Sequence, residues 1–307
     1  MSIASPAYSA LVPGTGQTAG SDRVGSIFSA VRRAGRICFV AYVVAGYPEF
    51  ETSERAALAA IDAGADVLEI GLPYSDPMAD GTTLQRASAT ALAAGATLDR
   101  SLRLVQLVCQ ARPATPVLVM GYVNQFLGPR GADNVAGRLA QAGASGAIVA
   151  DLTPDEGAPL EDAFRGHDLA LVYLVAPTTT QERVAAIARR GGGFVYCVSL
   201  SGVTGARRSL PSGLPALVRR VSAGSPLPVA IGFGVSRPAH VRAVARAGAD
   251  GVVVGSSLVA ALGERGTDVD CLARLCGTLR EATVIRGTAD ERRAAGGTRV
   301  AALRPAD

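Results

Sequence analysis

The stretch AGADVLEIG (residues 63–71) recurs twice more in the chain, as AGASGAIVAD (142–151) and AGADGVVVG (247–255). In each copy a helical pattern ends on Ala-Gly, and a short turn then enters an apolar run. Glycine suits the left-handed position that follows the last turn of a helix. The copies precede the second, fourth and eighth apolar runs, so the repeat predicts alternating helix and strand units rather than a solenoid.

Eight apolar runs alternate with helical patterns along the chain. Their hydrophobicity is continuous, as expected of parallel strands that are covered on both faces. Eight such strands separated by helices predict an α/β fold, a (β/α)8 TIM barrel that forms a single domain with an extra N-terminal helix. The runs are residues 37–45, 66–71, 116–122, 146–151, 169–177, 194–199, 227–233 and 251–256.

The two ends of the chain differ in composition from the predicted barrel. Residues 1–22 are rich in Ser, Gly, Ala and Pro, and we expect them to form a disordered N-terminal extension. Residues 284–307 are rich in Arg and interrupted by Gly, and we expect a flexible C-terminal tail. The predicted catalytic barrel therefore spans residues 23–283.

The basic residues exclude several classes of chemistry. All 30 of them are arginine, and the chain contains no lysine. A Schiff-base aldolase, a pyridoxal phosphate enzyme and a P-loop NTPase each need a lysine at the reaction centre. The net charge is only +4 at pH 7. No basic stripe is interleaved with aromatic residues, so we expect no nucleic-acid partner.

Several features favour a cytoplasmic protein. The 5 cysteines are an odd number without metal-type spacing, which predicts buried thiols in a reducing compartment. The N-terminus lacks the basic and apolar regions of a signal peptide. A membrane span needs about 18 consecutive apolar residues, and the sequence has no such run. We therefore expect no membrane partner.

One carboxylate interrupts an apolar run that otherwise predicts a buried strand. Glu69 lies between Leu68 and Ile70, and the loop after this run carries Asp76 and Asp80. Glu69 is either a solvent-facing or ion-paired strand residue, or an acid held in a dry pocket. Barrel enzymes place their working groups at the C-terminal ends of the strands. There a desolvated glutamate would have a raised pKa and could move a proton near neutral pH.

Small residues follow the last three predicted strands. The segments are SGVTG (201–205), GFGVS (232–236) and GSS (255–257). Glycines let backbone N–H groups approach an anion closely, and barrels commonly bind phosphate after the seventh and eighth strands. One such segment would only indicate a turn. Three in consecutive loops favour a phosphate site built from backbone amides.

The two histidines, His167 and His240, fall on predicted helices or connections, away from the strand ends. We expect them at the surface, and therefore predict neither a histidine metal site nor a Ser–His triad. Carboxylates and tyrosines remain as the acid–base groups. For Asp80 taken alone, capping of a turn is the simpler interpretation.

The stretch LEIGLPYSDPMADGTTLQ (68–85) resembles the signature of the tryptophan synthase alpha-subunit family. The resemblance runs in family order from about residue 24 to 283 and includes YVVAGYP (42–48), MGYVNQF (120–126), VADLTPDE (149–156), GVTGARRSL (202–210), IGFGVS (231–236) and GADGVVVGSSLV (249–259). It implies retro-aldol cleavage of indole-3-glycerol phosphate to indole and glyceraldehyde 3-phosphate, without a cofactor or metal.

The resemblance also implies a role for each matching residue. Glu69 would be the catalytic acid and base, Asp80 would hold the indole N–H, and Tyr196 would line the same pocket as a third catalytic-site residue. Thr204 would lie in a lid that closes on the substrate. The phosphate-binding positions would be Gly205, Gly234, Gly255 and Ser256, and the indole-pocket positions would be Tyr42, Met120, Tyr122 and Phe233.

The sequence departs from the family pattern at several positions. Thr82 and Ala41 replace common prolines, and Tyr42 replaces a common phenylalanine, which adds a hydroxyl that needs a partner. Leu200 occupies a variable position in the lid. We expect the loop that carries Asp80 to be more mobile without the proline at position 82.

The resemblance implies a tryptophan synthase beta subunit as partner, in an α2β2 heterotetramer. The loop that carries Pro73, Asp76 and Pro77 would face this partner. Two other functions stay open: a free-standing lyase that supplies indole to specialised metabolism, and a catalytically silent regulatory subunit. The presence of both Glu69 and Asp80 argues against a silent subunit. A phosphosugar isomerase would commonly use a Lys or His electrophile, which the predicted strand ends lack.

Overall fold

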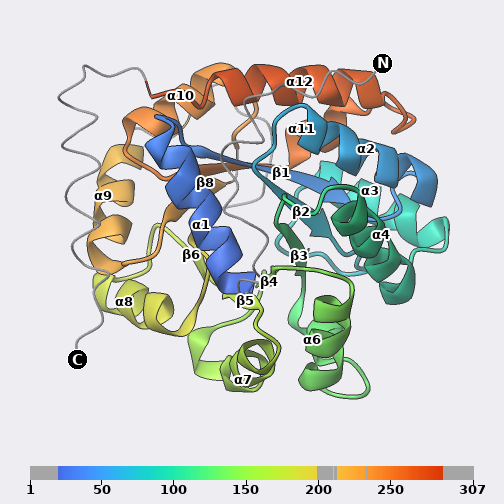
Figure 1. The fold of residues 1–307 in the computed structure, drawn as a ribbon, viewed down its shortest axis with the longest axis horizontal. Helices are drawn as coiled ribbons and strands as arrows, with labels where there is room; N and C mark the ends of the chain where they lie inside the picture. Colours follow the sequence, from blue (N-terminus) through green and yellow to red (C-terminus); the bar gives the residue numbers. More distant parts are fainter. Residues whose placement is uncertain (1–19, 199–209, 211–212, 233, 286–307) are drawn as a thin grey trace.

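A ring of parallel strands forms the centre of the computed structural model, which describes residues 20–198, 210, 213–232 and 234–285 (Figure 1). Neighbouring strands follow the order β5-β4-β3-β2-β1-β9-β8-β7-β6, and all of these pairings are parallel. The predicted barrel is confirmed. The strands are β1 (Cys38–Val44), β2 (Val67–Gly71), β3 (Val117–Gly121), β4 (Gly146–Val149), β5 (Ala170–Val172), β6 (Leu174–Val175), β7 (Val195–Val198), β8 (Val229–Gly232) and β9 (Gly251–Val254).

The predicted fifth strand, residues 169–177, is divided in two. β5 pairs with β4, and β6 pairs with β7, while Tyr173 lies between them. The staggered register of a barrel makes the two neighbours meet this segment at different heights. Because β5 and β6 are one stretch of chain, this segment closes the ring.

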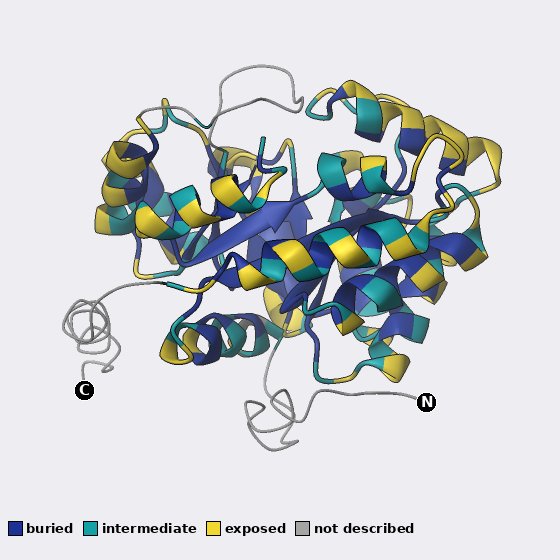
Figure 2. Ribbon diagram, turned by 90° about the horizontal axis from the view of Figure 1, so that it is seen from above, coloured by how far each residue is buried: buried dark blue, intermediate teal, exposed yellow. Residues whose placement is uncertain are grey.

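Helices surround the ring and cover the outer face of its strands. Figure 2 shows the strands buried at the centre, while each helix exposes only its outward face. This covering explains why the strand sequences are apolar throughout. The helices are α1 (Gly20–Arg33), α2 (Phe50–Asp62), α3 (Thr82–Ala93), α4 (Leu98–Ala111), α5 (Val123–Leu127), α6 (Ala132–Gln141), η1 (Pro154–Glu156), α7 (Ala158–Gly166), α8 (Gln181–Arg190), α9 (Leu214–Gly224), α10 (Pro238–Arg246), α11 (Ser256–Ala261) and α12 (Val269–Glu281).

The predicted extra helix is α1, which packs against the ends at which the strands begin. Val24, Phe28 and Val31 of α1 join a buried cluster with early strand residues such as Cys38. The ring centroids of Phe28 and Phe194 lie 5.1 Å apart. Helix α1 therefore fills one end of the barrel with apolar side chains.

The Asp of the repeated AGAD sequence has a structural role at this same end. The Asp66 carboxylate accepts a hydrogen bond from the Phe39 amide at 2.9 Å and pairs with buried Arg36 at 3.0 Å. The Asp250 carboxylate likewise accepts a hydrogen bond from the Val229 amide at 2.9 Å and forms an ion pair with Arg32 of α1. Each carboxylate thus joins the start of one strand to the strand beside it.

The terminal boundaries differ slightly from those expected. Helix α1 begins at Gly20, so residues 20–22 belong to it rather than to an extension. At the other end, the Ile285 amide donates to the Gly35 carbonyl at 2.9 Å, which holds residues 284–285 against the turn between α1 and β1. Residues 1–19 and 286–307 lie outside the described residues.

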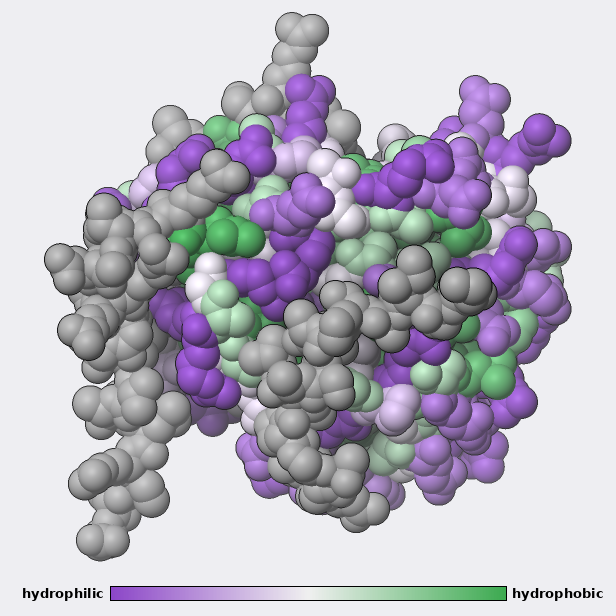
Figure 3. All heavy atoms as spheres, turned by 45° about the horizontal axis from the view of Figure 1, so that its top comes forward, coloured by the Kyte–Doolittle hydropathy of each residue, from purple (hydrophilic) through white to green (hydrophobic). Residues whose placement is uncertain are grey.

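The surface combines polar and apolar side chains. On the face shown in Figure 3, hydrophobic residues gather in small patches among hydrophilic ones, which is usual for a protein surface in water. Within the described ranges, no helix has the length and apolar character that a membrane crossing requires.

Candidate active site

Glu69 occupies an inward position of β2. Val67 belongs to the cluster inside the barrel, whereas Leu68 and Ile70 pack with the residues of the surrounding helices. Because strand side chains alternate, Glu69 faces the barrel interior together with Val67 and Gly71. The side chain is 1% exposed, and its Oε2 atom has no hydrogen-bond partner among the described residues.

Burial has a large effect on the proton affinity of this group. It raises the pKa of the Glu69 carboxyl to about 8, and the nearby charge of Asp80 raises it further. Of the two interpretations of Glu69, the structure supports a buried acid, and the described residues give it neither an exposed side chain nor an ion pair.

Asp80 lies in the loop between β2 and α3 and is partly buried. Burial raises the pKa of its carboxyl to about 6, and a hydrogen bond from the Tyr122 hydroxyl, 3.3 Å away, acts in the opposite direction. The structure thus places two carboxylates near one another with different proton affinities. Near pH 7 Glu69 is mostly protonated, whereas Asp80 is mostly ionised.

Two buried tyrosines, Tyr42 and Tyr196, lie near these carboxylates. Tyr42 is the neighbour of Glu69 in the β1–β2 register, so both residues face the interior. The pKa of each tyrosine is raised well above its usual value, mainly by burial and further by the charges of Glu69 and Asp80. The hydroxyls therefore stay protonated and can donate hydrogen bonds.

Tyr122 and Met120, the other described positions of the predicted indole pocket, come from the end of β3. Tyr122 is 6% exposed, and its hydroxyl accepts a hydrogen bond from the Ala79 amide at 3.0 Å. Met120 is partly buried and packs against both hydrophobic clusters of the protein. Aromatic and thioether groups thus lie beside the carboxylates. Phe233 lies outside the described residues.

The predicted phosphate residues come from two neighbouring loops. Gly234 follows β8 and has a φ of 79°, a conformation that favours glycine. Gly255 precedes α11, of which Ser256 is the first residue. The hydroxyl of Ser257 donates to the Val235 carbonyl at 3.3 Å and thereby joins the two loops. Gly205 and the lid residue Thr204 lie outside the described residues.

A family model described as tryptophan synthase alpha chain matches residues 28–283. The chain belongs to the tryptophan synthase alpha chain family. The alpha chain of Roseiflexus sp. (strain RS-1) is 45% identical over 237 residues, which are 77% of this chain and 90% of the relative. The alpha chain of Methanothermobacter thermautotrophicus is 42% identical over 255 residues, which are 82% and 94% of the two chains.

Solved structures of the tryptophan synthase alpha family share the fold. A structure of Mycobacterium tuberculosis tryptophan synthase matches with a TM-score of 0.79 at 39% identity, over 85% of this chain and 98% of that chain. The alpha subunit from Legionella pneumophila str. Paris matches with a TM-score of 0.78 at 33% identity, over 85% and 98%. The fold shared with these relatives agrees with the barrel expected from the sequence.

One of the two histidines of this alpha-family chain is not at the surface. His240 is only 4% exposed in the first turn of α10, and its Nδ1 accepts from the Ser236 amide at 3.3 Å. It precedes buried Val244 by one helical turn, a spacing that indicates the inner face of a helix. His167 is partly exposed and lies 3.0 Å from the Asp133 carboxylate.

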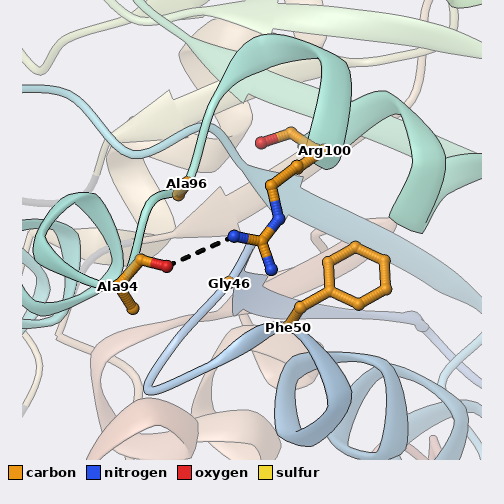
Figure 4. A pocket seen from close by; sticks show the side chains of 6 residues that line it. Gly46, Phe50, Ala94, Ala96 and Arg100 are labelled. Atoms are coloured by element: carbon orange, nitrogen blue, oxygen red, sulfur yellow. Dashed lines mark hydrogen bonds between the residues drawn. The ribbon is translucent and has the colours of Figure 1, made fainter.

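A small hollow is lined by none of the residues predicted for tryptophan synthase alpha chemistry (Figure 4). It is bounded by Gly46 and Phe50 after β1 and by Ala94 and Ala96 between α3 and α4. The Arg100 guanidinium reaches over the Phe50 ring, 5.6 Å from its centroid, and donates to the Ala94 carbonyl at 3.3 Å. Arg100 thus links the two loops and serves as a structural residue.

The described part of this alpha-family chain holds no group of three or more His, Cys, Asp or Glu residues that could bind a metal ion. All five cysteines lie in described residues and are free thiols. Burial raises the pKa of the Cys109 thiol to about 11 and that of Cys197 to about 12, so these side chains are poor nucleophiles.

Proposed function

We propose that this chain cleaves indole-3-glycerol phosphate to indole and glyceraldehyde 3-phosphate. The observation that carries the proposal is the pair of carboxylates, a buried Glu69 with a pKa of about 8 near Asp80 with a pKa of about 6. Groups whose surroundings push their pKa values apart can take separate acid and base roles. Family membership supports the same reaction.

The reaction needs one proton donor that later becomes a proton acceptor. Protonated Glu69 gives its proton to C3 of the indole ring, which places positive charge on N1. The bond between C3 and the side chain then breaks, and its electron pair returns to the ring. Glu69 takes the proton of the adjacent hydroxyl, whose oxygen becomes the aldehyde of glyceraldehyde 3-phosphate. Atoms and charge balance without an outside reactant.

Asp80 stabilises the charge that develops during this step. Its ionised carboxylate accepts the N1–H hydrogen bond, which strengthens as the ring becomes positive. Tyr42, Met120 and Tyr122 form the walls around the ring, and Tyr196 completes the buried side near Glu69. Exclusion of water from this region keeps Glu69 protonated until the substrate is bound.

The substrate phosphate binds at the two joined loops after β8 and β9. Gly234, Gly255 and Ser256 offer backbone N–H groups and one hydroxyl without a bulky side chain in the way. Gly205 would add a fourth backbone contact, and the segment with Thr204 would close over the bound substrate. Such a site needs no lysine, in agreement with a chain that contains none.

A beta subunit is the proposed partner, in an α2β2 assembly in the cytoplasm. Relatives named as an alpha chain or subunit support a second chain. The loop after β2 carries Met78, which is 92% exposed, beside Leu92 of α3, which is 37% exposed. Both residues line an open hollow that a partner could fill. Two exposed apolar side chains that line one hollow form a patch, and exposed apolar patches favour a protein interface.

The test is incubation of the purified protein with indole-3-glycerol phosphate, with and without a beta subunit, while indole is measured. We expect slow indole release that the beta subunit accelerates. Rapid release by the isolated chain would instead favour a free-standing lyase. Substitution Glu69→Gln should lower kcat by about 10²–10⁴-fold. Glu264→Gln, at an exposed position, serves as the control. Full activity of Glu69→Gln, or no indole under either condition, would contradict the proposal.

A further inference from the structure

The loop between β2 and α3, which carries Asp80, is fastened to the residues that follow β3. Gln125 donates a hydrogen bond to the Pro73 carbonyl at 3.0 Å, near the start of the loop. Asn124 donates to the Tyr74 hydroxyl at 3.3 Å. Tyr122 holds the other end of the loop. The position of Asp80 therefore depends on a neighbouring βα unit as well as on its own.

The Tyr122 hydroxyl makes two hydrogen bonds to adjacent loop residues. It accepts from the Ala79 amide at 3.0 Å and donates to Asp80 Oδ2 at 3.3 Å. A hydroxyl has one donor and two acceptor sites, so both bonds can exist together. The Tyr122 ring also stacks on Tyr74, with centroids 4.9 Å apart and planes inclined by 24°. The ring and the hydroxyl are thus fixed at the same time.

The backbone of Tyr122 is held from two directions. Its amide donates to Gln125 Oε1 at 3.0 Å, and the next amide, that of Val123, donates to Asp151 Oδ1 at 2.8 Å. Asp151 follows β4, so the anchor of Tyr122 draws on two strands of the barrel. A side chain supported in this way can impose a position on a loop.

We propose that Tyr122 is a positioning residue whose hydroxyl aims the Asp80 carboxylate at the indole N1–H and holds the loop backbone at Ala79. This inference rests on the proposed function and gives Tyr122 a role beyond that of a pocket wall. The hydroxyl engages Oδ2 of Asp80 and leaves Oδ1 to accept the N1–H bond. One fixed bond to a carboxylate restricts the direction of its second oxygen.

The same bond opposes the effect of burial on Asp80. Burial raises the pKa of this carboxyl to about 6, and the Tyr122 bond lowers it, because a hydroxyl donor stabilises the ionised form. Without that donor, more of Asp80 would be protonated near neutral pH, and its neutral carboxyl would accept a weaker hydrogen bond from the positively charged indole N1–H. The titratable groups coupled to Asp80 are Glu69 of β2, Tyr42 of β1, Tyr122 after β3 and Tyr196 of β7.

The variant Tyr122→Phe tests the proposal, because it keeps the ring and removes the hydroxyl. Tyr74→Phe is the comparison variant, because it removes a hydroxyl that fastens the start of the same loop to Asn124 but makes no hydrogen bond to Asp80 among the described contacts. It therefore separates a general loosening of the loop from loss of the Tyr122–Asp80 bond. We expect Tyr122→Phe to lower kcat roughly tenfold, with a smaller change in KM. The pH below which the activity of this variant falls should be higher than in the wild type by about half a pH unit or more.

Two readouts do not depend on activity. The carboxyl carbon of Asp80, followed by ¹³C NMR, should titrate at a higher pH in Tyr122→Phe than in the wild type and in Tyr74→Phe. The Ala79 amide should exchange its hydrogen roughly tenfold faster in Tyr122→Phe. An unchanged titration midpoint and exchange rate would overturn the proposal. If the wild type released no indole, the proposed reaction would fail, while these two measurements would still decide whether Tyr122 holds Asp80.

Discussion

The hydroxyl oxygen of Tyr42 lies 2.0 Å from the point that a β-carbon on Gly71 would occupy. Gly71 is two residues beyond Glu69, the register neighbour of Tyr42, so the ring leans across β2 toward the strand end. Tyr196 repeats the arrangement on the other side of the barrel, with its hydroxyl 2.3 Å from the corresponding point on Gly232. Each tyrosine therefore needs the glycine of the next strand.

Substitution Gly71→Ala should damage the site because the added methyl group would overlap the Tyr42 ring and force it to move. Displacements of about 1 Å near reacting groups can cost on the order of 10²-fold in rate, and overpacking typically costs about 1–3 kcal/mol of stability. We expect kcat/KM for indole release to fall by a factor of about 10 to 100.

The control for that substitution is Gly277→Ala, because a β-carbon at Gly277 of α12 would meet no atom within 4 Å apart from its chain neighbours and the backbone of its own helix. Alanine in a helix interior is more favourable than glycine by about 1 kcal/mol, so this variant should be slightly more stable and fully active. The loss in Gly71→Ala should shrink in a Tyr42→Ala background. If the two substitutions instead lowered kcat/KM independently, so that their effects added in the double mutant, the contact between Tyr42 and the new methyl group would not be the cause of the loss.

The dependence of kcat/KM on pH should be bell-shaped. The proposed reaction needs ionised Asp80 and protonated Glu69, whose carboxyls have pKa values of about 6 and about 8. Activity should therefore fall below about pH 6 and above about pH 8. Because the two carboxyls interact, the two apparent pKa values measured from this profile describe the pair rather than either residue alone. Activity that continued to rise to pH 9 would show that Glu69 does not act first as an acid.

The barrel could be predicted from the sequence because local patterns encode it. The run at residues 66–71 became β2 (Val67–Gly71), and the repeated Ala-Gly turns enter β2, β4 and β9 as expected. The break at Tyr173 could not be predicted in this way. It depends on where β4 and β7 meet the segment, which is a property of the whole ring rather than of the local sequence.

The site could be predicted only in part. Apolar neighbours on both sides of Glu69 do not reveal which face of β2 is the barrel interior, since both faces are buried. Family resemblance supplied the roles of Glu69 and Asp80. The bonds from Tyr122 to Ala79 and Asp80 join residues that are 43 and 42 positions apart, and no local pattern indicates them.

The stability of the variant Glu69→Gln relative to the wild type should increase with pH. The Glu69 carboxyl has a pKa of about 8 in the folded protein, against 4.5 ordinarily. Between these values the folded state keeps a proton that the unfolded chain has released, so wild-type stability falls as pH rises through this window. Glutamine cannot ionise. The free energy of unfolding of the variant, relative to that of the wild type, should therefore be higher at pH 9 than at pH 5 by about 4 kcal/mol, as measured by denaturant unfolding. An equal difference at both pH values would show that burial does not hold the proton on Glu69.

The repeat that begins the strands offers a comparison between Asp66 and Ser145, which occupy the same place in two of its copies. Asp66 is paired with buried Arg36 and accepts from the Phe39 amide, so Asp66→Asn leaves a buried guanidinium without its counter-charge. Loss of one partner from a buried pair costs about 3–5 kcal/mol.

The Ser145 hydroxyl is buried and has no hydrogen-bond partner among the described residues. A buried hydroxyl without a partner is itself unfavourable. Its removal in Ser145→Ala should therefore lower the free energy of unfolding by less than about 0.5 kcal/mol, or raise it. Urea unfolding of both variants measures the difference, and similar losses in the two would show that the Asp66 carboxylate is not what joins β1 to β2 at this end of the barrel.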